Sequence, residues 1–143
     1  MTQKEFLKVT KNCFEKCGCI SDRKRFVYDA DKLYVVFILL RSNYSDCYYI
    51  DYNFSIKALH PKFTLKDDSL DFILQPRLTL INDIVQIKYL ELNESDYEYS
   101  LINTIKNLIE SITNNNFKFL IQLQKKGFVL EPRAQKFLSN LVV

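Results

Sequence analysis

The stretch from Tyr49 to Lys57, "YIDYNFSIK", carries the clearest structural signal in the chain. Every second residue from Ile50 to Ile56 is large and apolar, and the residues between them, starting at Asp51, are polar. Successive side chains of a β-strand point to opposite faces, so a period of two over eight residues predicts a strand. We expect its apolar face to lie in the core and its polar face to lie in water, as in an antiparallel sheet with one solvated side.

The residues before this strand predict two more strands. The apolar run Leu33 to Leu40, "LYVVFILL", and the shorter run Phe26 to Tyr28 are bounded by the polar turns "SDRKR" and "DADK". After the strand, His60-Pro61 ends the pattern because proline cannot donate a ladder hydrogen bond. The run 70–80, "LDFILQPRLTL", predicts a fourth extended segment that is bent or at an edge because of its proline. The stretch 81–92, "INDIVQIKYLEL", fits a strand or a helix equally well.

Helical patterns flank these strands. A capping box at Thr2 and Glu5 begins an apolar stripe that predicts a helix over about residues 3–17, with Gly18 as its C-cap. A second capping box at Ser95 and Glu98 precedes a strongly amphipathic helix that reaches about residue 112. Further helices are predicted over 117–126 and from Pro132 onward. The sequence therefore predicts one α+β domain over 1–143, with an N-terminal helix, about four antiparallel strands and C-terminal helices on one sheet face.

The composition limits the class of protein. The chain has 143 residues, of which 48% are hydrophobic, and it contains only 2 Gly and 3 Pro, so disordered and low-complexity classes are excluded. Its most apolar run, Leu33 to Leu40, is too short to span a bilayer as a helix. No secretory signal is visible, and four unevenly spaced cysteines are typical of reduced thiols. We therefore expect a cytoplasmic protein without a membrane partner.

Several segments carry a family resemblance. They are "FEKCGCISDRKRFVYD" at 14–29, "VVFILLRSNYSDCYYIDYNFSIKAL" at 35–59, "PRL" at 76–78 and "FKFLIQLQKKG" at 117–127. Together they resemble the bacterial family catalogued as domain of unknown function 4304. Gly18, Asn53 and Arg77 stand at that family's glycine, asparagine and arginine positions, whereas Cys19 replaces its usual aromatic residue. The resemblance implies an α+β fold and supplies no catalytic residue. It also points to small immunity or antagonist proteins encoded near toxins, phages and mobile elements.

The segment Cys13 to Cys19, "CFEKCGC", holds three of the four cysteines. A structural zinc site needs four ligands, and the fourth would have to be the distant Cys47 or His60. Cys13 and Cys17 also fall on the apolar stripe of the first predicted helix, where free cysteine behaves as a small buried hydrophobe. We therefore expect core cysteines and no metal or cofactor.

No constellation of residues predicts an enzyme. The only histidine, His60, needs a partner that orients it before it can serve in acid–base catalysis, and it sits at a strand end before proline. The carboxylates Asp67, Asp68 and Asp71 could form a hard-metal site, but in a loop flanked by lysines we expect them to be solvated. An enzyme stays a hypothesis beside the two binding hypotheses given below. It would place His60 or Arg77 in a pocket beside a carboxylate.

Charge is unevenly distributed. Residues 91–113 carry 1 basic and 5 acidic groups, whereas 114–143 carry 5 and 1. The acidic stretch has two interpretations: its carboxylates stabilise a helix N-terminus, or they contact a basic partner such as a nuclease, with tyrosines as anchors. The predicted contact residues are Glu91, Glu94, Asp96, Tyr97, Glu98 and Tyr99.

A basic turn offers an alternative contact surface, for nucleic acid. Its cations would meet phosphates, and tyrosines of the neighbouring hairpin would stack on bases. The residues of this alternative are Arg23, Lys24, Arg25, Arg41, Tyr44 and Tyr48. Between the two, the sequence favours a protein-binding module, most concretely an immunity-like or phage antagonist-like inhibitor of a toxin, nuclease or defence effector.

Overall fold

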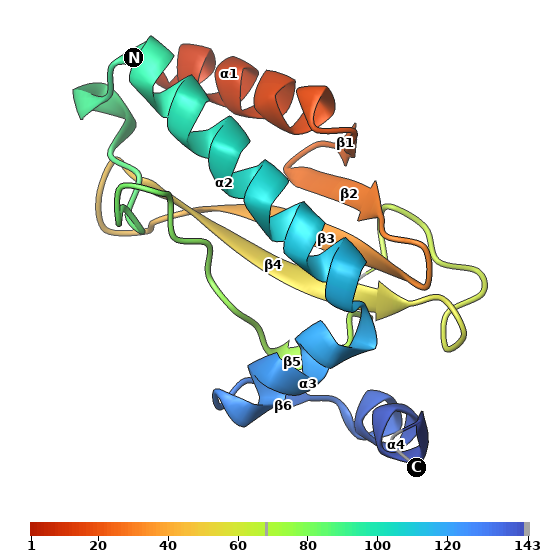
Figure 1. Cartoon of the computed structure of the whole chain (residues 1–143). Helices are drawn as coiled ribbons and strands as arrows, with labels where there is room; N and C mark the ends of the chain where they lie inside the picture. The colour runs from red at the N-terminus through yellow and green to blue at the C-terminus, as the bar shows by residue number, and fades with distance from the viewer. Residues whose placement is uncertain (68, 142–143) are drawn as a thin grey trace.

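Four antiparallel strands form the main sheet of the protein (Figure 1). The computed structural model describes residues 1–67 and 69–141. The strands β1 (Ile20–Asp22), β2 (Arg25–Asp29), β3 (Leu33–Arg41) and β4 (Tyr48–Ile56) follow one another in the order β1-β2-β3-β4. The hairpin of β3 and β4 is the longest, with nine paired positions from Leu33↔Ile56 to Arg41↔Tyr48. The α+β class and the strand predicted over Ile50 to Ile56 are confirmed.

Strand β1 was not predicted, because it has only three residues and no alternating pattern. It pairs with β2 across a two-residue turn, Arg23-Lys24, in the register Asp22↔Arg25. Arg23 has a φ of 58°, in the left-handed region that usually favours glycine. The basic turn predicted from "SDRKR" is therefore a tight hairpin at the edge of the sheet.

Two helices cover one face of this sheet, which we call the inner face (Figure 1). The first, α1 (Gln3–Lys16), begins with the predicted capping box, in which Thr2 and Glu5 satisfy each other's backbone amides. The ring of Phe14 stacks on Phe26 of β2 with 4.2 Å between ring centroids. The second helix, α2 (Glu94–Asn115), packs along α1 and crosses the same face. Its N-cap is Asn93, whose side chain accepts from the Asp96 amide, so the cap predicted at Ser95 is wrong.

The C-terminal part lies beyond the end of α2 (Figure 1). Asn116, with a φ of 51°, separates α2 from α3 (Phe117–Lys125), and α4 (Pro132–Leu141) begins at the predicted proline. Between α3 and α4, β6 (Val129–Leu130) pairs with β5 (Phe72–Leu74) in a separate two-stranded sheet. Buried residues of α3, α4 and the main sheet belong to one apolar cluster. None of the helices in the described part of the chain is long and apolar enough to cross a membrane.

The outer face of β4 differs from expectation. Asp51, Asn53 and Ser55 were predicted to be solvated, but all three are buried. The chain after β4 covers this face in two parts. A strap, which we define as residues 57–67 and 69–71, folds back over it, and Phe63 of the strap stacks on Tyr34 with 5.0 Å between centroids. Gln75 and Arg77, further along the chain, bind the Asp51 carboxylate. The prediction was wrong because the covering residues are remote from the strand pattern.

The free edge of β4 is also closed. The segment after β5 runs beside this edge, where Tyr52 donates to the Pro76 carbonyl and Leu78 donates to Ile50. The stretch 81–92, left open by the sequence, contributes a bridge between Ile87 and Tyr48 and a short 3₁₀ helix, η1 (Tyr89–Glu91).

Candidate protein-binding surface

The predicted acidic surface begins at η1 and continues into the first turn of α2. Glu91, Glu94 and Asp96 are all exposed there, and we call these three residues the acidic surface. Within the described chain, no basic side chain lies at ion-pair distance from any of them. Glu94 and Asp96 also stand in the first turn of α2, at the positive end of its macrodipole.

Tyr97 is not part of this surface. Its side chain is only 2% exposed, and its hydroxyl lies 2.6 Å from Thr10 Oγ1 on α1. Burial raises the pKa of the Tyr97 phenol, so the hydroxyl stays protonated and joins the two helices. The predicted contact role is therefore wrong. The helical spacing contained a signal for this: Tyr97 falls four residues before Leu101 on the buried stripe of α2.

Glu98 already has a basic partner on α1, whereas the Tyr99 side chain is exposed and can contact another protein. Glu98 Oε1 lies 2.8 Å from Lys16 Nζ on α1, and this hydrogen bond raises the pKa of Lys16. Because this pair is exposed to solvent, water and salt screen it and it adds little to stability. Tyr99 is 68% exposed on the solvent side of α2, as an anchor residue must be. Of the six predicted contact residues, four are thus exposed and unpaired in the described structure: Glu91, Glu94, Asp96 and Tyr99.

The structure adds neighbours that the sequence did not indicate. Leu90, in η1, is 61% exposed, and it lines a hollow of about 370 Å³ between η1 and the β3–β4 hairpin loop. Asp46 of that loop lines the same hollow, and Tyr44, almost fully exposed, lies two residues before it. No local pattern could have joined these residues, since more than 40 positions separate the hairpin loop from η1.

The residues of the nucleic-acid alternative do not all reach a common surface. Tyr48 is 0% exposed on the inner face, where its hydroxyl accepts from Gln3 Nε2 at 2.8 Å, so it cannot stack on a base. Arg25 donates to the backbone carbonyl of Asp67, and Arg41 lies 3.5 Å from Asp46. Arg23 and Lys24 are exposed at the turn, and Tyr44 is exposed on the separate hairpin loop.

Of the two cysteines on the predicted apolar stripe, Cys13 is buried and Cys17 is half-buried. Cys13 and Cys19 are buried, and burial raises the pKa of each thiol to about 12. Cys47 differs: burial opposes its ionisation, but hydrogen bonds, among them those from Ser45 and Gln86, lower its pKa overall. In the described ranges, 1–67 and 69–141, no three or more His, Cys, Asp or Glu residues gather as a metal site would require.

His60 and Arg77 each have a carboxylate partner. His60 Nε2 lies 2.7 Å from Asp71 Oδ1, and Arg77 Nε donates to Asp51 Oδ1 at 2.7 Å. The prediction of a solvated Asp71 is wrong, since this residue is fully buried; Asp67 lies in the strap, and Asp68 falls outside the described residues. The Arg77 guanidinium also lies over the Tyr49 ring, 4.1 Å from its centroid. Both pairs hold the chain that follows β4 against that strand.

These two pairs could hold a substrate only if they faced a cavity. Arg77 does line a shallow hollow of about 430 Å³ between α2 and the chain around Leu78. His60 and Asp71 line none of the five hollows described for this structure. Asp71 faces Nε2 of the imidazole, so Nδ1 is the ring nitrogen that a reacting group would have to reach. Their geometry accounts for fixing the strap.

Comparisons of the chain with family models, with curated proteins and with solved structures found no match. The resemblance to the domain of unknown function 4304 family therefore stays a prediction. A functional proposal has to rest on the surface chemistry of the chain itself.

Proposed function

We propose that this protein acts by binding another protein through the acidic surface and the apolar side chains beside it. The observation that carries the proposal is the combination of three exposed, unpaired carboxylates with the exposed Leu90 and Tyr99. Apolar anchors of this kind contribute most of the affinity of a protein interface, and surrounding charges select the partner. The partner is expected to present a basic surface.

The proposed effect on the partner is inhibition. A protein whose basic surface binds nucleic acid, such as a toxin nuclease, loses access to its substrate when an acidic protein covers that surface. This immunity-like or antagonist-like role also agrees with what the family resemblance implies. It requires no catalytic residue in the inhibitor, since complementary shape and charge are sufficient.

The test starts from the partner. Tagged protein is used to recover partners from a lysate of the native host, with and without nuclease treatment, and the recovered protein is purified and identified. Its affinity is then measured by calorimetry at several salt concentrations for the wild type and for Glu91→Lys/Glu94→Lys. We expect the double variant to bind at least about tenfold more weakly, and the wild-type affinity to fall with salt.

A matched control keeps the charge change and moves it elsewhere. Glu15→Lys/Glu110→Lys alters two exposed carboxylates on the solvent sides of α1 and α2 and changes the net charge equally. It should bind as the wild type does. Equal affinity of the wild type and the Glu91→Lys/Glu94→Lys variant, with circular dichroism showing both folded, would remove the acidic surface from the interface. Failure of saturating protein to reduce the partner's own activity would exclude the inhibitory role.

A further inference from the structure

We propose that the groove between the strap and the outer face of β1 and β2 binds an extended acidic peptide with an aliphatic side chain. This surface is built from other residues than the acidic surface, and the inference does not depend on the function proposed above. Two adjoining hollows form the groove, of about 700 and 440 Å³. They share Asp22, Leu65 and Lys66, so the groove continues past the tip of the strap.

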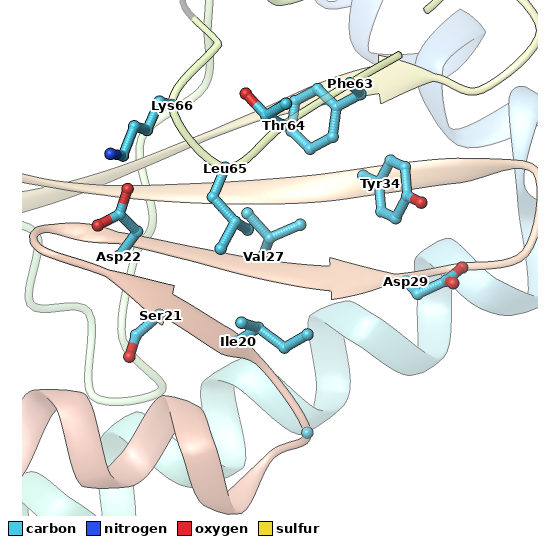
Figure 2. Close-up of a pocket in the computed structure, with 11 residues that line it drawn as sticks. Ile20, Ser21, Asp22, Val27, Asp29, Tyr34, Phe63, Thr64, Leu65 and Lys66 are labelled. Atoms are coloured by element: carbon cyan, nitrogen blue, oxygen red, sulfur yellow. The ribbon is translucent and has the colours of Figure 1, made fainter. Parts of the chain in front are cut away.

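The larger hollow has an apolar interior. Figure 2 shows Leu65 of the strap directed toward Val27 of β2, with Ile20 of β1 beside them. Ile20 is 65% exposed although it is a large aliphatic residue on the open side of the sheet. An aliphatic side chain placed against Ile20 would remove apolar surface from water, which favours binding.

The smaller hollow is basic. Its lining consists of four cationic residues, one carboxylate and two aliphatic residues: Arg23, Lys24, Arg25, Lys66, Asp22, Ile38 and Leu65. In the described part of the chain, neither Arg23 nor Lys66 has a carboxylate at ion-pair distance. These two cations are therefore available for carboxylates of a bound peptide. The attraction between these opposite charges is the reason for proposing an acidic occupant.

The dimensions suit an extended chain. Strand β2 runs from Arg25, in the basic hollow, to Asp29, in the apolar one, which at about 3.3 Å per residue is about 13 Å. A peptide of about four or five residues lies along this length, with its acidic residues near Arg23 and Lys66 and its aliphatic residue near Ile20.

A nucleic acid fits the same groove less well. Single strands bind by stacking bases on aromatic faces, and the aromatic residues here are already engaged. Tyr34 stacks on Phe63 and has the Lys57 ammonium 4.7 Å from its ring centroid. In addition, the carboxylate of Asp29 lines the apolar hollow at the end away from the basic hollow, where it would repel a phosphate backbone that continued along the groove; the acidic residues of the proposed peptide lie at the other end.

The experiment uses a displayed library of random dodecapeptides selected on the immobilised full chain. We expect enrichment of sequences with two or more Asp or Glu residues next to Leu, Ile or Val. A fluorescein-labelled peptide of the strongest sequence should bind at least about tenfold more weakly to Arg23→Glu/Lys66→Glu. Ile20→Glu should weaken binding comparably, and because Ile20 is exposed this change leaves the fold intact.

Two controls separate this result from general charge effects and from the proposed function. Lys118→Glu/Lys125→Glu, on the exposed side of α3, makes the same change in net charge and should bind the peptide normally. So should Glu91→Lys/Glu94→Lys, since the acidic surface is not in the groove. The proposal is overturned if no acidic sequence is enriched, or if the enriched peptide binds the Arg23→Glu/Lys66→Glu variant as tightly as the wild type. It is equally overturned if only a labelled single-stranded oligonucleotide binds and that binding is lost in this variant.

Discussion

Asp71 holds the strap against the sheet with both its side chain and its backbone. Its Oδ2 accepts from the Ile56 amide at 2.6 Å, and its Oδ1 contacts His60. Its own amide donates to the Phe54 carbonyl, and its carbonyl accepts from Glu131, which precedes α4. One residue therefore joins the end of β4, the strap and the C-terminal part of the chain.

Because Asp71 is fully buried, ionisation of its carboxyl costs free energy. Burial raises the pKa of this carboxyl, although the hydrogen bonds from His60 and Ile56 partly oppose the shift. A carboxyl with a raised pKa in the folded state binds a proton more readily there than in the unfolded state. Its contribution to stability is therefore largest at low pH and falls as pH rises from the ordinary aspartate range, about 3.9, through the raised value.

Two substitutions test this. Asp71→Ala leaves the buried Ile56 amide without its acceptor and should lower the free energy of unfolding by about 1–3 kcal/mol. Asp71→Asn removes the titration and keeps one oxygen that can accept from the Ile56 amide. Urea unfolding of the wild type and of Asp71→Asn over a pH series should show the wild type losing stability relative to the variant as pH rises. A relative gain with rising pH would mean that the folded state favours the charged form.

At the scale of the element, the start of α2 can be tested directly. Asn93 caps the helix by accepting from Asp96, whereas Ser95 lies inside its first turn and caps nothing. Asn93→Ala should therefore lower the free energy of unfolding by about 1 kcal/mol, and Ser95→Ala should change it by less than about 0.5 kcal/mol. Thermal and urea unfolding of both variants measure this. Equal losses would mean that the helix begins at the position that the sequence suggested.

The elements with a strong period were predictable from sequence. Strand β4 and helices α1 to α4 each carry an apolar repeat long enough to specify their type, and β3 is a continuous apolar run of strand length. Strands β1 and β6, of three and two residues, are too short for any repeat and exist because a neighbouring strand pairs with them. The burial of Asn53 was unpredictable for a related reason: its amide bonds to Phe72 and Gln75, some twenty residues away.

The candidate surface was predictable in part. The carboxylates Glu91, Glu94 and Asp96 stand out by their charge, and Tyr99 by its place on the solvent side of α2. Leu90 becomes part of the surface only because η1 turns it outward beside the hairpin loop. The apolar hollow of the groove was not predictable, since Ile20 and Leu65 line one hollow only when the strap has folded over the sheet.

At the scale of the whole molecule, two cysteines report on cooperative unfolding. Cys13 and Cys19 belong to the central apolar cluster and have thiol pKa values of about 12, so they are both inaccessible and protonated at neutral pH. We expect them to react with a thiol reagent only when the domain opens, at a rate that follows global unfolding as urea is added. Peptide mass spectrometry assigns each modified thiol, and fully denatured protein, in which all four react, is the control. Rapid labelling of Cys13 or Cys19 in the native protein would reveal that α1 detaches on its own.

The two ends of the strap also limit where homologous chains can carry insertions and deletions. Insertions and deletions in surface loops are usually tolerated, and the chain between β4 and β5 resembles such a loop in sequence. Here, however, His60 and Asp71 fix it at both ends against the sheet, so changes in length are expected in the span between them, which is held only at Phe63 and at the Asp67 carbonyl among its described residues. That span contributes Phe63 to Lys66 to the groove. Homologous chains are therefore expected to vary in the specificity of the groove while they retain the two anchoring residues.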